Sequence, residues 1–119
     1  MNVLVVDDSK AMRTMIIRTV KAAGFPDLAF AEASNGAEAL AAVRQSPPDL
    51  VLTDWNMPEM SGIEFTEALR AEGNAVRVAF VTSEQNPSMV ERAQQAGALF
   101  VIAKPFTPDV IHAALAKVI

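Results

Sequence analysis

The stretch VLVVDDSKAMRTMIIRTVKAAG, residues 3 to 24, contains a complete strand-to-helix unit. Residues 3–6 are apolar and mostly β-branched, which is typical of a buried strand. Residues 10–23 then carry apolar side chains at helical spacing, and the pattern stops at Gly24, before Pro26. The apolar positions of this helix are Met12, Met15, Ile16, Val20 and Ala23. The stretch therefore predicts a strand followed by a helix that packs one face against a sheet.

The same unit recurs along the whole chain. A helical pattern follows each of five short apolar runs, at 3–6, 28–33, 50–53, 77–81 and 99–102. Strands that alternate with helices over short connections pair in parallel through right-handed crossovers. The sequence thus predicts one doubly wound α/β domain over residues 1–119, a five-stranded parallel sheet with helices on both faces. The runs at 3–6, 50–53 and 99–102 lack alternation, which predicts strands that are apolar on both faces.

Local signals mark the starts of the later helices, and Thr107 is the predicted cap of the last one. We expect these helices to begin near Asn35, Gly62, Asn86 and Thr107. A proline follows each of the last two, at Pro87 and Pro108, and proline suits the first helical position. The helix after Asn86 has the fewest apolar residues, so we expect it to be the most weakly packed.

Composition excludes several classes of function. The chain has 119 residues, a net charge of -4 and no cysteine, so neither a disulfide framework nor a thiolate metal site is available. Its ten basic residues are scattered, which argues against direct binding to nucleic acid. No apolar run approaches the roughly 18 residues that span a membrane, and no signal segment precedes the first strand. We therefore expect a cytoplasmic domain without a membrane segment.

Four of the five predicted strands are followed by polar residues that are candidates for a site. They are Asp7 and Asp8 after the first, Asp54 after the third, Thr82 after the fourth and Lys104 after the fifth. Ligands of doubly wound sheets bind at the carboxyl ends of the strands, where these residues should meet. Three carboxylates at one edge repel one another unless a cation joins them, and Mg²⁺ prefers such oxygen ligands.

This set of residues resembles the receiver domain of bacterial response regulators. Four features match the pattern of this family: the acid pair, Asp54 with "DWNMPEMSG", the hydroxyl of Thr82 and the Lys-Pro pair at Lys104. The resemblance covers the whole chain. It is strongest to the single-domain, chemotaxis-type members. The resemblance implies a flavodoxin-like sheet with strand order 2-1-3-4-5.

The resemblance also implies that Asp54 accepts a phosphoryl group from a phosphohistidine on a partner histidine kinase or phosphotransfer protein. Asp8, Asp54 and the backbone carbonyl of Asn56 would bind Mg²⁺ directly, and Asp7 would act mainly through water. Such a protein is a signalling component and not an enzyme acting on a separate substrate.

Further residues acquire roles through the same resemblance. Lys104 and Thr82 would contact the phosphoryl oxygens, and Asn56 and Glu84 would border the path of an attacking water and so modulate the lifetime of the phosphoryl group. A downstream protein would bind the face formed by the helix after Asn86, the last strand and the helix after Thr107. One position departs from the family, because Val101 stands where an aromatic switch residue is usual. We therefore expect Thr82 to respond while the aromatic rotamer switch is absent or is replaced by motion of the helix after Asn86.

Other interpretations of these residues remain open at this stage. Asp7 or Asp8 could be a helix N-cap and Asp54 a turn residue. The fold could also serve a Mg²⁺-dependent phosphohydrolase, an FMN carrier or an interaction module that is never phosphorylated. The adjacent acids argue against the first two. The hydrolases have the pattern D-x-D after the first strand, and an FMN phosphate would be repelled by two carboxylates.

Overall fold

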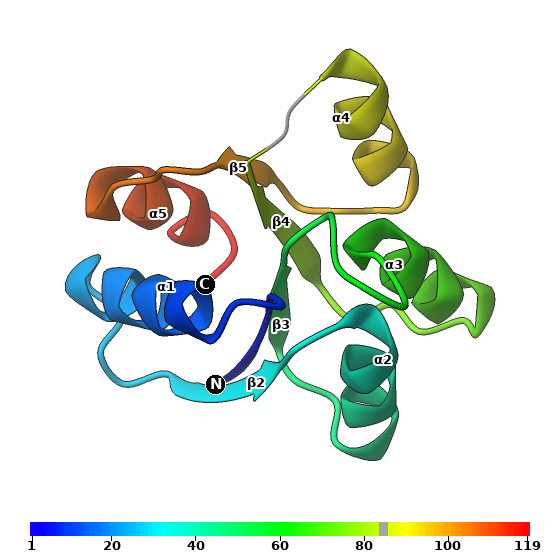
Figure 1. Ribbon diagram of the computed structural model, residues 1–119. Helices are drawn as coiled ribbons and strands as arrows, with labels where there is room; N and C mark the ends of the chain where they lie inside the picture. The colour runs from blue at the N-terminus through cyan, green and yellow to red at the C-terminus, as the bar shows by residue number, and fades with distance from the viewer. Residues whose placement is uncertain (84–85) are drawn as a thin grey trace.

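The computed structural model describes residues 1–83 and 86–119, which form a three-layered α/β domain (Figure 1). The elements in chain order are β1 (Asn2–Val6), α1 (Lys10–Ala22), β2 (Ala29–Ala33), α2 (Gly36–Gln45), β3 (Leu50–Thr53), α3 (Gly62–Ala71), β4 (Val78–Thr82), α4 (Pro87–Gln95), β5 (Val101–Ala103) and α5 (Pro108–Leu115). None of the helices in the described residues is long and apolar enough to cross a membrane.

All described strand pairs are parallel, and the strand order in the sheet is β2-β1-β3-β4-β5. This confirms the predicted fold class and the order that the resemblance implied. In the pairing of β1 with β3, Val6 lies opposite Thr53. The residues that follow these two, Asp7 and Asp54, are therefore brought to the same edge of the sheet.

The sheet buries apolar side chains on both faces because successive residues of a strand point in opposite directions. On one face, α1 and α5 cover Val3, Val5 and their neighbours in β3 and β4. On the other face, α2, α3 and α4 cover Leu4, Val6 and the alternate residues. Figure 1 shows the two helical layers on opposite sides of the sheet. This close packing makes the sheet a rigid base for the groups at its edge.

The burial of the last two strands differs from the prediction. The run at 99–102 was expected to be buried on both faces, but β5 starts at Val101, which is half-buried, and ends at exposed Ala103. The prediction was wrong because β5 lies at the edge of the sheet. It is β4, shifted by one residue from the predicted run at 77–81, that is buried at every position.

Side-chain caps fix the start of each helix, and the later helices begin close to the predicted positions. Asn35, Ser61, Asn86 and Thr107 each accept a hydrogen bond from a backbone N–H in the first turn of α2, α3, α4 and α5. For α1 the cap is Ser9, so the alternative in which an acid of the pair caps this helix is wrong. α4 buries only Ala93 completely, in keeping with its low apolar content.

The loop between β3 and α3 is held in place by a glycine at its end. The N–H of Gly62 donates to the carbonyl of Trp55 over 2.8 Å. A Cβ atom at this glycine would lie 1.9 Å from the carbonyl oxygen of Asp54, far inside contact distance. The start of α3 can therefore approach the end of β3 only because residue 62 has no side chain.

Gly62→Ala should destabilise the protein by about 3 kcal/mol, because the added methyl group forces backbone atoms apart in a packed region. Urea denaturation measures this loss. Gly73→Ala is the matched control, since its Cβ would meet nothing within 4 Å and only its positive φ of 76° is unfavourable. The control should lose about 1 to 2 kcal/mol. Equal losses in the two variants would contradict the steric explanation.

Candidate functional site

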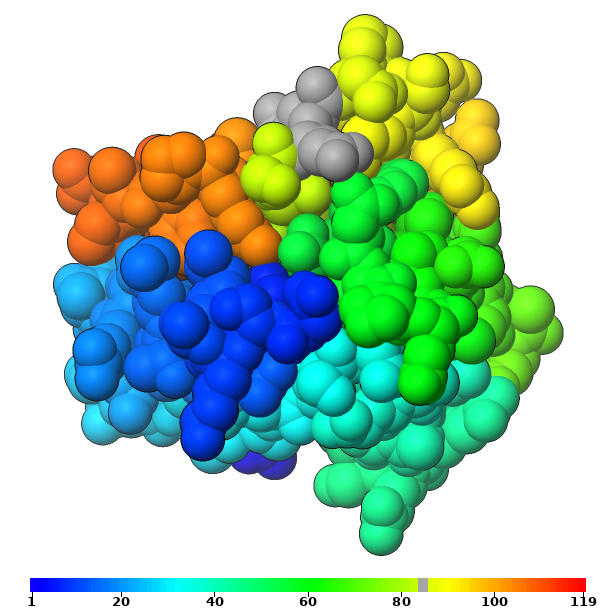
Figure 2. All heavy atoms as spheres, in the orientation of Figure 1, coloured from blue at the N-terminus to red at the C-terminus, as the bar shows by residue number. Residues whose placement is uncertain are grey.

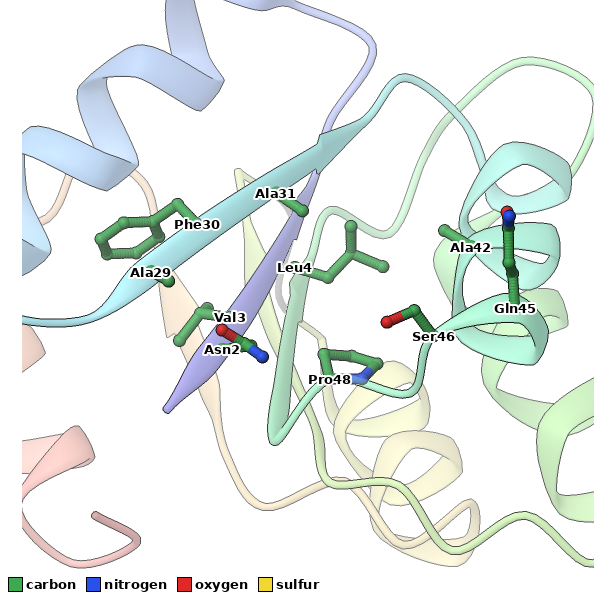
Figure 3. Close-up of a pocket in the computed structure, with 10 residues that line it drawn as sticks. All are labelled: Asn2, Val3, Leu4, Ala29, Phe30, Ala31, Ala42, Gln45, Ser46 and Pro48. Carbon is green, nitrogen blue, oxygen red and sulfur yellow. The ribbon is translucent and has the colours of Figure 1, made fainter.

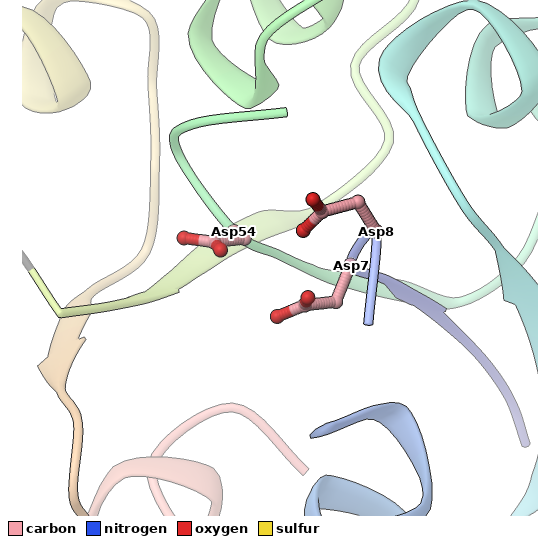
Figure 4. Close-up of side chains that lie close together, drawn as sticks. All are labelled: Asp7, Asp8 and Asp54. Atoms are coloured by element: carbon pink, nitrogen blue, oxygen red, sulfur yellow. The ribbon is translucent and has the colours of Figure 1, made fainter. Parts of the chain in front are cut away.

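Three carboxylates converge at the carboxyl edge of the sheet. Asp7 and Asp8 follow β1, and Asp54 follows β3. The backbone N–H of Asp54 donates to the carbonyl of Val6 over 2.9 Å. One oxygen atom from each acid can be chosen so that all three lie within 4.8 Å of one another. Figure 4 shows the three side chains close together at the ends of β1 and β3.

The Asp7 carboxylate is buried and has a partner on each oxygen. Its side chain is 2% exposed. Oδ1 accepts the backbone N–H of Ser9 at 2.9 Å, and Oδ2 accepts the Lys104 ammonium at 2.8 Å. A buried carboxylate is costly unless it is paired in this way, so Asp7 is a fixed part of the site.

Asp54 is less buried than Asp7, with 13% of its side chain exposed. Its Oδ1 accepts the backbone N–H of Trp55 at 2.7 Å, and its Oδ2 lies 3.2 Å from Nζ of Lys104. Burial raises the pKa of Asp54 above its ordinary value, and the charge of Lys104 offsets this only in part. The ionised form of Asp54 is thus less favourable in the folded protein than in water.

Lys104 links the two acids from the end of β5. Its backbone N–H donates to the carbonyl of Thr82 over 2.9 Å, which fixes the start of its side chain beside β4. Burial alone would lower the pKa of Lys104, but its hydrogen bond to Asp7 and the charge of Asp54 raise it above its usual value. Lys104 is therefore a permanent positive charge between the two carboxylates.

Asp8 completes the group as its exposed member. In residues 1–83 and 86–119, its carboxylate has neither a hydrogen bond nor an ion pair to another side chain. Its oxygens are thus available to a cation in solvent contact. Three carboxylates with one accessible side fit a hard divalent ion such as Mg²⁺, which takes oxygen ligands and keeps several waters.

The structure places the other predicted site residues as follows. Thr82 is the last residue of β4 and is 1% exposed, while Asn56 is exposed two residues after Asp54. Glu84 lies outside the described residues. Val101 is paired in register with Phe80 on β4. The structure therefore brings Asp7, Asp8, Asp54 and Lys104 together, and places Thr82 in the backbone contact with Lys104.

The family model described as the response regulator receiver domain matches residues 3–116 of the chain. The chain belongs to this family. It is 38% identical to the chemotaxis protein CheY1 of Helicobacter pylori, over 100% of this chain and 97% of that protein. It is 36% identical to the chemotaxis protein CheY of Pseudomonas aeruginosa, over 99% of this chain and 95% of that protein.

A solved structure agrees with this assignment. The chemotaxis protein CheY4 of Vibrio cholerae matches with a TM-score of 0.85 and 32% identity, over 99% of this chain and 98% of the other. The chain is thus a CheY-type receiver domain, a component of two-component signalling. Receiver domains bind Mg²⁺ through an acidic cluster, and this chain has a group of three acids, Asp7, Asp8 and Asp54, that could hold a metal ion.

Two contacts near the acids of this receiver domain were missed from the sequence. Arg13 on α1 contacts both Glu32 on β2 and the carbonyl of Asp7. Trp55 is buried and packs on Phe80, with ring centroids 5.0 Å apart. Arg13 could have been noticed as a charged residue one turn into the helix that follows the acid pair. The aromatic contact has no comparable signal, because Trp55 lies in the loop after β3 and Phe80 lies on β4, far away in the sequence.

The surface view shows how the edge of the receiver domain is assembled. In Figure 2 the segment after β1 (blue), the loop after β3 (green) and the segment after β5 (orange) meet on one face. A separate hollow of about 260 Å³ lies between β2 and α2, lined in part by Leu4, Ala31 and Ala42 (Figure 3). It also includes Asn2, at the opposite end of β1, and none of the acids, so it is no part of the acidic site.

Asp54→Asn should raise the free energy of unfolding of the metal-free protein at pH 7. The pKa of Asp54 is raised by folding, so its contribution to stability is present below the unfolded pKa and is lost as pH rises through the folded pKa. The asparagine removes this loss, while Lys104 keeps its bond to Asp7. The gain should shrink as pH falls from 7 toward 4, as urea denaturation in the presence of a chelator would show.

Asp27→Asn is the control for this prediction, because Asp27 is an exposed aspartate away from the site. It should change stability little at either pH. A loss of stability on Asp54→Asn at pH 7 would contradict the assignment of Asp54 as a destabilising charge.

Proposed function

We propose that this receiver domain accepts a phosphoryl group on Asp54 and thereby changes its affinity for a downstream protein. The donor is a phosphohistidine of a histidine kinase or of a histidine phosphotransfer protein. The observation that carries the proposal is the pairing of Lys104 with both Asp7 and Asp54 beside the accessible Asp8. This arrangement supplies one carboxylate as the nucleophile, together with the positive charge that stabilises an incoming phosphoryl group.

In the transfer step, an Asp54 oxygen forms a bond to phosphorus as the bond from phosphorus to the histidine nitrogen breaks. The departing imidazole keeps the electron pair of that bond. The Lys104 ammonium already lies 3.2 Å from Asp54 and is a point charge of the kind that binds phosphate oxygens. It therefore offsets the negative charge that arrives with the phosphoryl group.

The carboxylates would hold the metal that this reaction requires. Asp8 and Asp54 would bind Mg²⁺ directly together with the backbone carbonyl of Asn56, and Asp7 would act mainly through water. When bound, Mg²⁺ supplies positive charge to the phosphoryl oxygens. Asp7 instead orients Lys104, to which it is tied by the shorter of the two lysine contacts.

Three further residues are proposed to act on the phosphorylated form. The Thr82 hydroxyl would bond one phosphoryl oxygen, since this residue ends β4 beside Lys104. Asn56 and Glu84 would flank the approach of water and so set how long the phosphoryl group survives. These assignments are supported by the family membership and by the placement of Thr82 and Asn56 next to the site.

The output face is proposed to consist of α4, β5 and α5. α4 buries little apolar surface, so a modest change at its start can move it. Val101 cannot provide an aromatic ring, but Phe80 lies opposite it on β4 and contacts Trp55, the neighbour of Asp54. We therefore expect the signal to reach this face through Thr82 and the packing against α4, without a rotamer switch on β5.

On this proposal, the protein binds two other proteins, the phosphoryl donor and the downstream target. Relatives that are named as chemotaxis proteins support a role in chemotaxis, in which a kinase phosphorylates a single receiver domain that binds a separate target. We propose that the domain, taken as one unit over residues 1–119, works in the cytoplasm and binds neither nucleic acid nor a membrane directly.

Trp55 allows the proposal to be tested without knowledge of the kinase. It is the only tryptophan of the chain, and its backbone N–H donates to the Asp54 carboxylate. Its fluorescence should change on addition of Mg²⁺ and change again with Mg²⁺ and beryllofluoride, which mimics a phosphoryl group on aspartate. The Mg²⁺ response should weaken on acidification, because the ligands must be deprotonated.

Asp54→Asn should abolish the beryllofluoride response, whereas Asp27→Asn should leave it intact. Persistence of the response in Asp54→Asn would exclude this residue as the phosphoacceptor. Incubation with candidate histidine kinases that carry labelled phosphate then identifies the donor, with the same pair of variants as controls.

Val101→Tyr tests whether an aromatic ring at position 101 is sufficient to restore the switch. The natural chain has no tyrosine, so the NMR signals of a labelled tyrosine ring in this variant have one source. Beryllofluoride and Mg²⁺ should shift these signals, and Thr82→Ala in the same background should remove the shift. Ring signals that do not respond would show that this chain has no coupling from Thr82 to position 101.

A further inference from the structure

Arg13, on the helix that follows the acid pair, bonds both to β2 and to the residue that follows β1. Its Nε donates to Oε1 of Glu32 on β2 at 2.9 Å, and its Nη1 donates to the backbone carbonyl of Asp7 at 2.7 Å. The Arg13 side chain is 14% exposed and the Glu32 side chain 42%, so the bond to the Asp7 carbonyl is partly buried while the ion pair with Glu32 lies at the surface. A guanidinium can make both bonds at once because its donors form a rigid fork.

The bond to the Asp7 carbonyl acts on Asp8. This carbonyl belongs to the peptide unit that joins the two acids, and a peptide unit is planar. Fixing its oxygen therefore fixes the plane from which the Asp8 side chain starts. The Asp8 carboxylate has no partner of its own in the described part of the chain, so the fixed peptide is what limits the positions that its side chain can reach.

The geometry points to Arg13 as a positioning residue for the magnesium site. It holds the peptide between Asp7 and Asp8 so that the exposed carboxylate faces Asp54, and Glu32 in turn holds Arg13. This inference rests on the proposed function, because it concerns the metal that the phosphoryl transfer needs. Arg13 itself binds neither the metal nor the phosphoryl group.

The charge of Arg13 and its hydrogen bond to Asp7 should have opposite effects on magnesium affinity. A positive side chain near the site repels Mg²⁺, so its removal would tighten metal binding if charge alone mattered. Loss of the hydrogen bond to Asp7 would instead weaken binding. Groups that orient metal ligands commonly contribute a factor of ten or more to metal affinity, so the positioning effect should exceed the repulsion.

Arg13→Met separates the two effects, because methionine keeps an apolar stem but has neither charge nor donor. The dissociation constant for Mg²⁺, measured by Trp55 fluorescence, should rise about tenfold. Arg18→Met removes a charge from an exposed position of the same helix and should leave the constant unchanged or slightly lower. Arg13→Lys, which keeps the charge and a single donor group, should recover part of the affinity.

A matched pair at Glu32 tests the second half of the inference. Glu32→Gln and Glu32→Ala lose the same charge, but only the glutamine keeps an acceptor for Arg13. Magnesium affinity should stay near that of the natural protein in Glu32→Gln and fall in Glu32→Ala. In the Arg13→Met background the two Glu32 variants should no longer differ, as expected if Glu32 acts through Arg13.

Each outcome distinguishes this inference from the proposed function. All variants are compared at a temperature where circular dichroism shows them folded, and the Glu32 pair decides if Arg13→Met does not fold. Unchanged or tighter Mg²⁺ binding in folded Arg13→Met, or equal affinities for the Glu32 pair, would overturn the role of Arg13. Absence of a Mg²⁺ response in the natural protein would instead overturn the proposed function.

Discussion

The contact of one ammonium with two carboxylates decides the character of this domain. Lys104 lies 97 residues from Asp7 and 50 residues from Asp54 along the chain, yet it bonds to both. The contact exists only because β1, β3 and β5 run in the same direction and end at one edge. It also solves an electrostatic problem, since Asp7 is buried and would be costly without a cation. The sheet and the site are therefore two results of the same arrangement.

The apolar part of the molecule makes this concentration of charge possible. β1, β3 and β4 are buried on both faces, and the helices that cover them hold the strand ends in fixed positions. The neighbouring loop is equally constrained, because α3 starts at a glycine pressed against the Asp54 carbonyl. The ionised Asp54 is disfavoured by burial, and both a divalent cation and a phosphoryl group would change that balance. A rigid site with an electrostatically unfavourable carboxylate is well suited to respond to a modification of that carboxylate.

The proposed site matches the family pattern more closely than the proposed switch does. The acids and the lysine match the receiver domain pattern, but position 101 on β5 carries valine. The aromatic volume in this region comes from Phe80 on β4 and from Trp55 beside Asp54. The weakly buried α4 lies next to this group, so packing on that side of the sheet offers a route from the site to the surface.

The sequence by itself determined the fold class, the starts of the helices and the acids, hydroxyl and lysine of the candidate site. These features have local signals: apolar periodicity, capping residues and polar residues at strand ends. Only the tertiary structure decided that β5 is an exposed edge while β4 is fully buried, that Ser9 caps α1, and that Lys104 is shared between Asp7 and Asp54. The contacts of Arg13 and the pairing of Trp55 with Phe80 belong to the same class. Each depends on which strands are neighbours and on how side chains fill the space between them, and no local pattern in the chain encodes either.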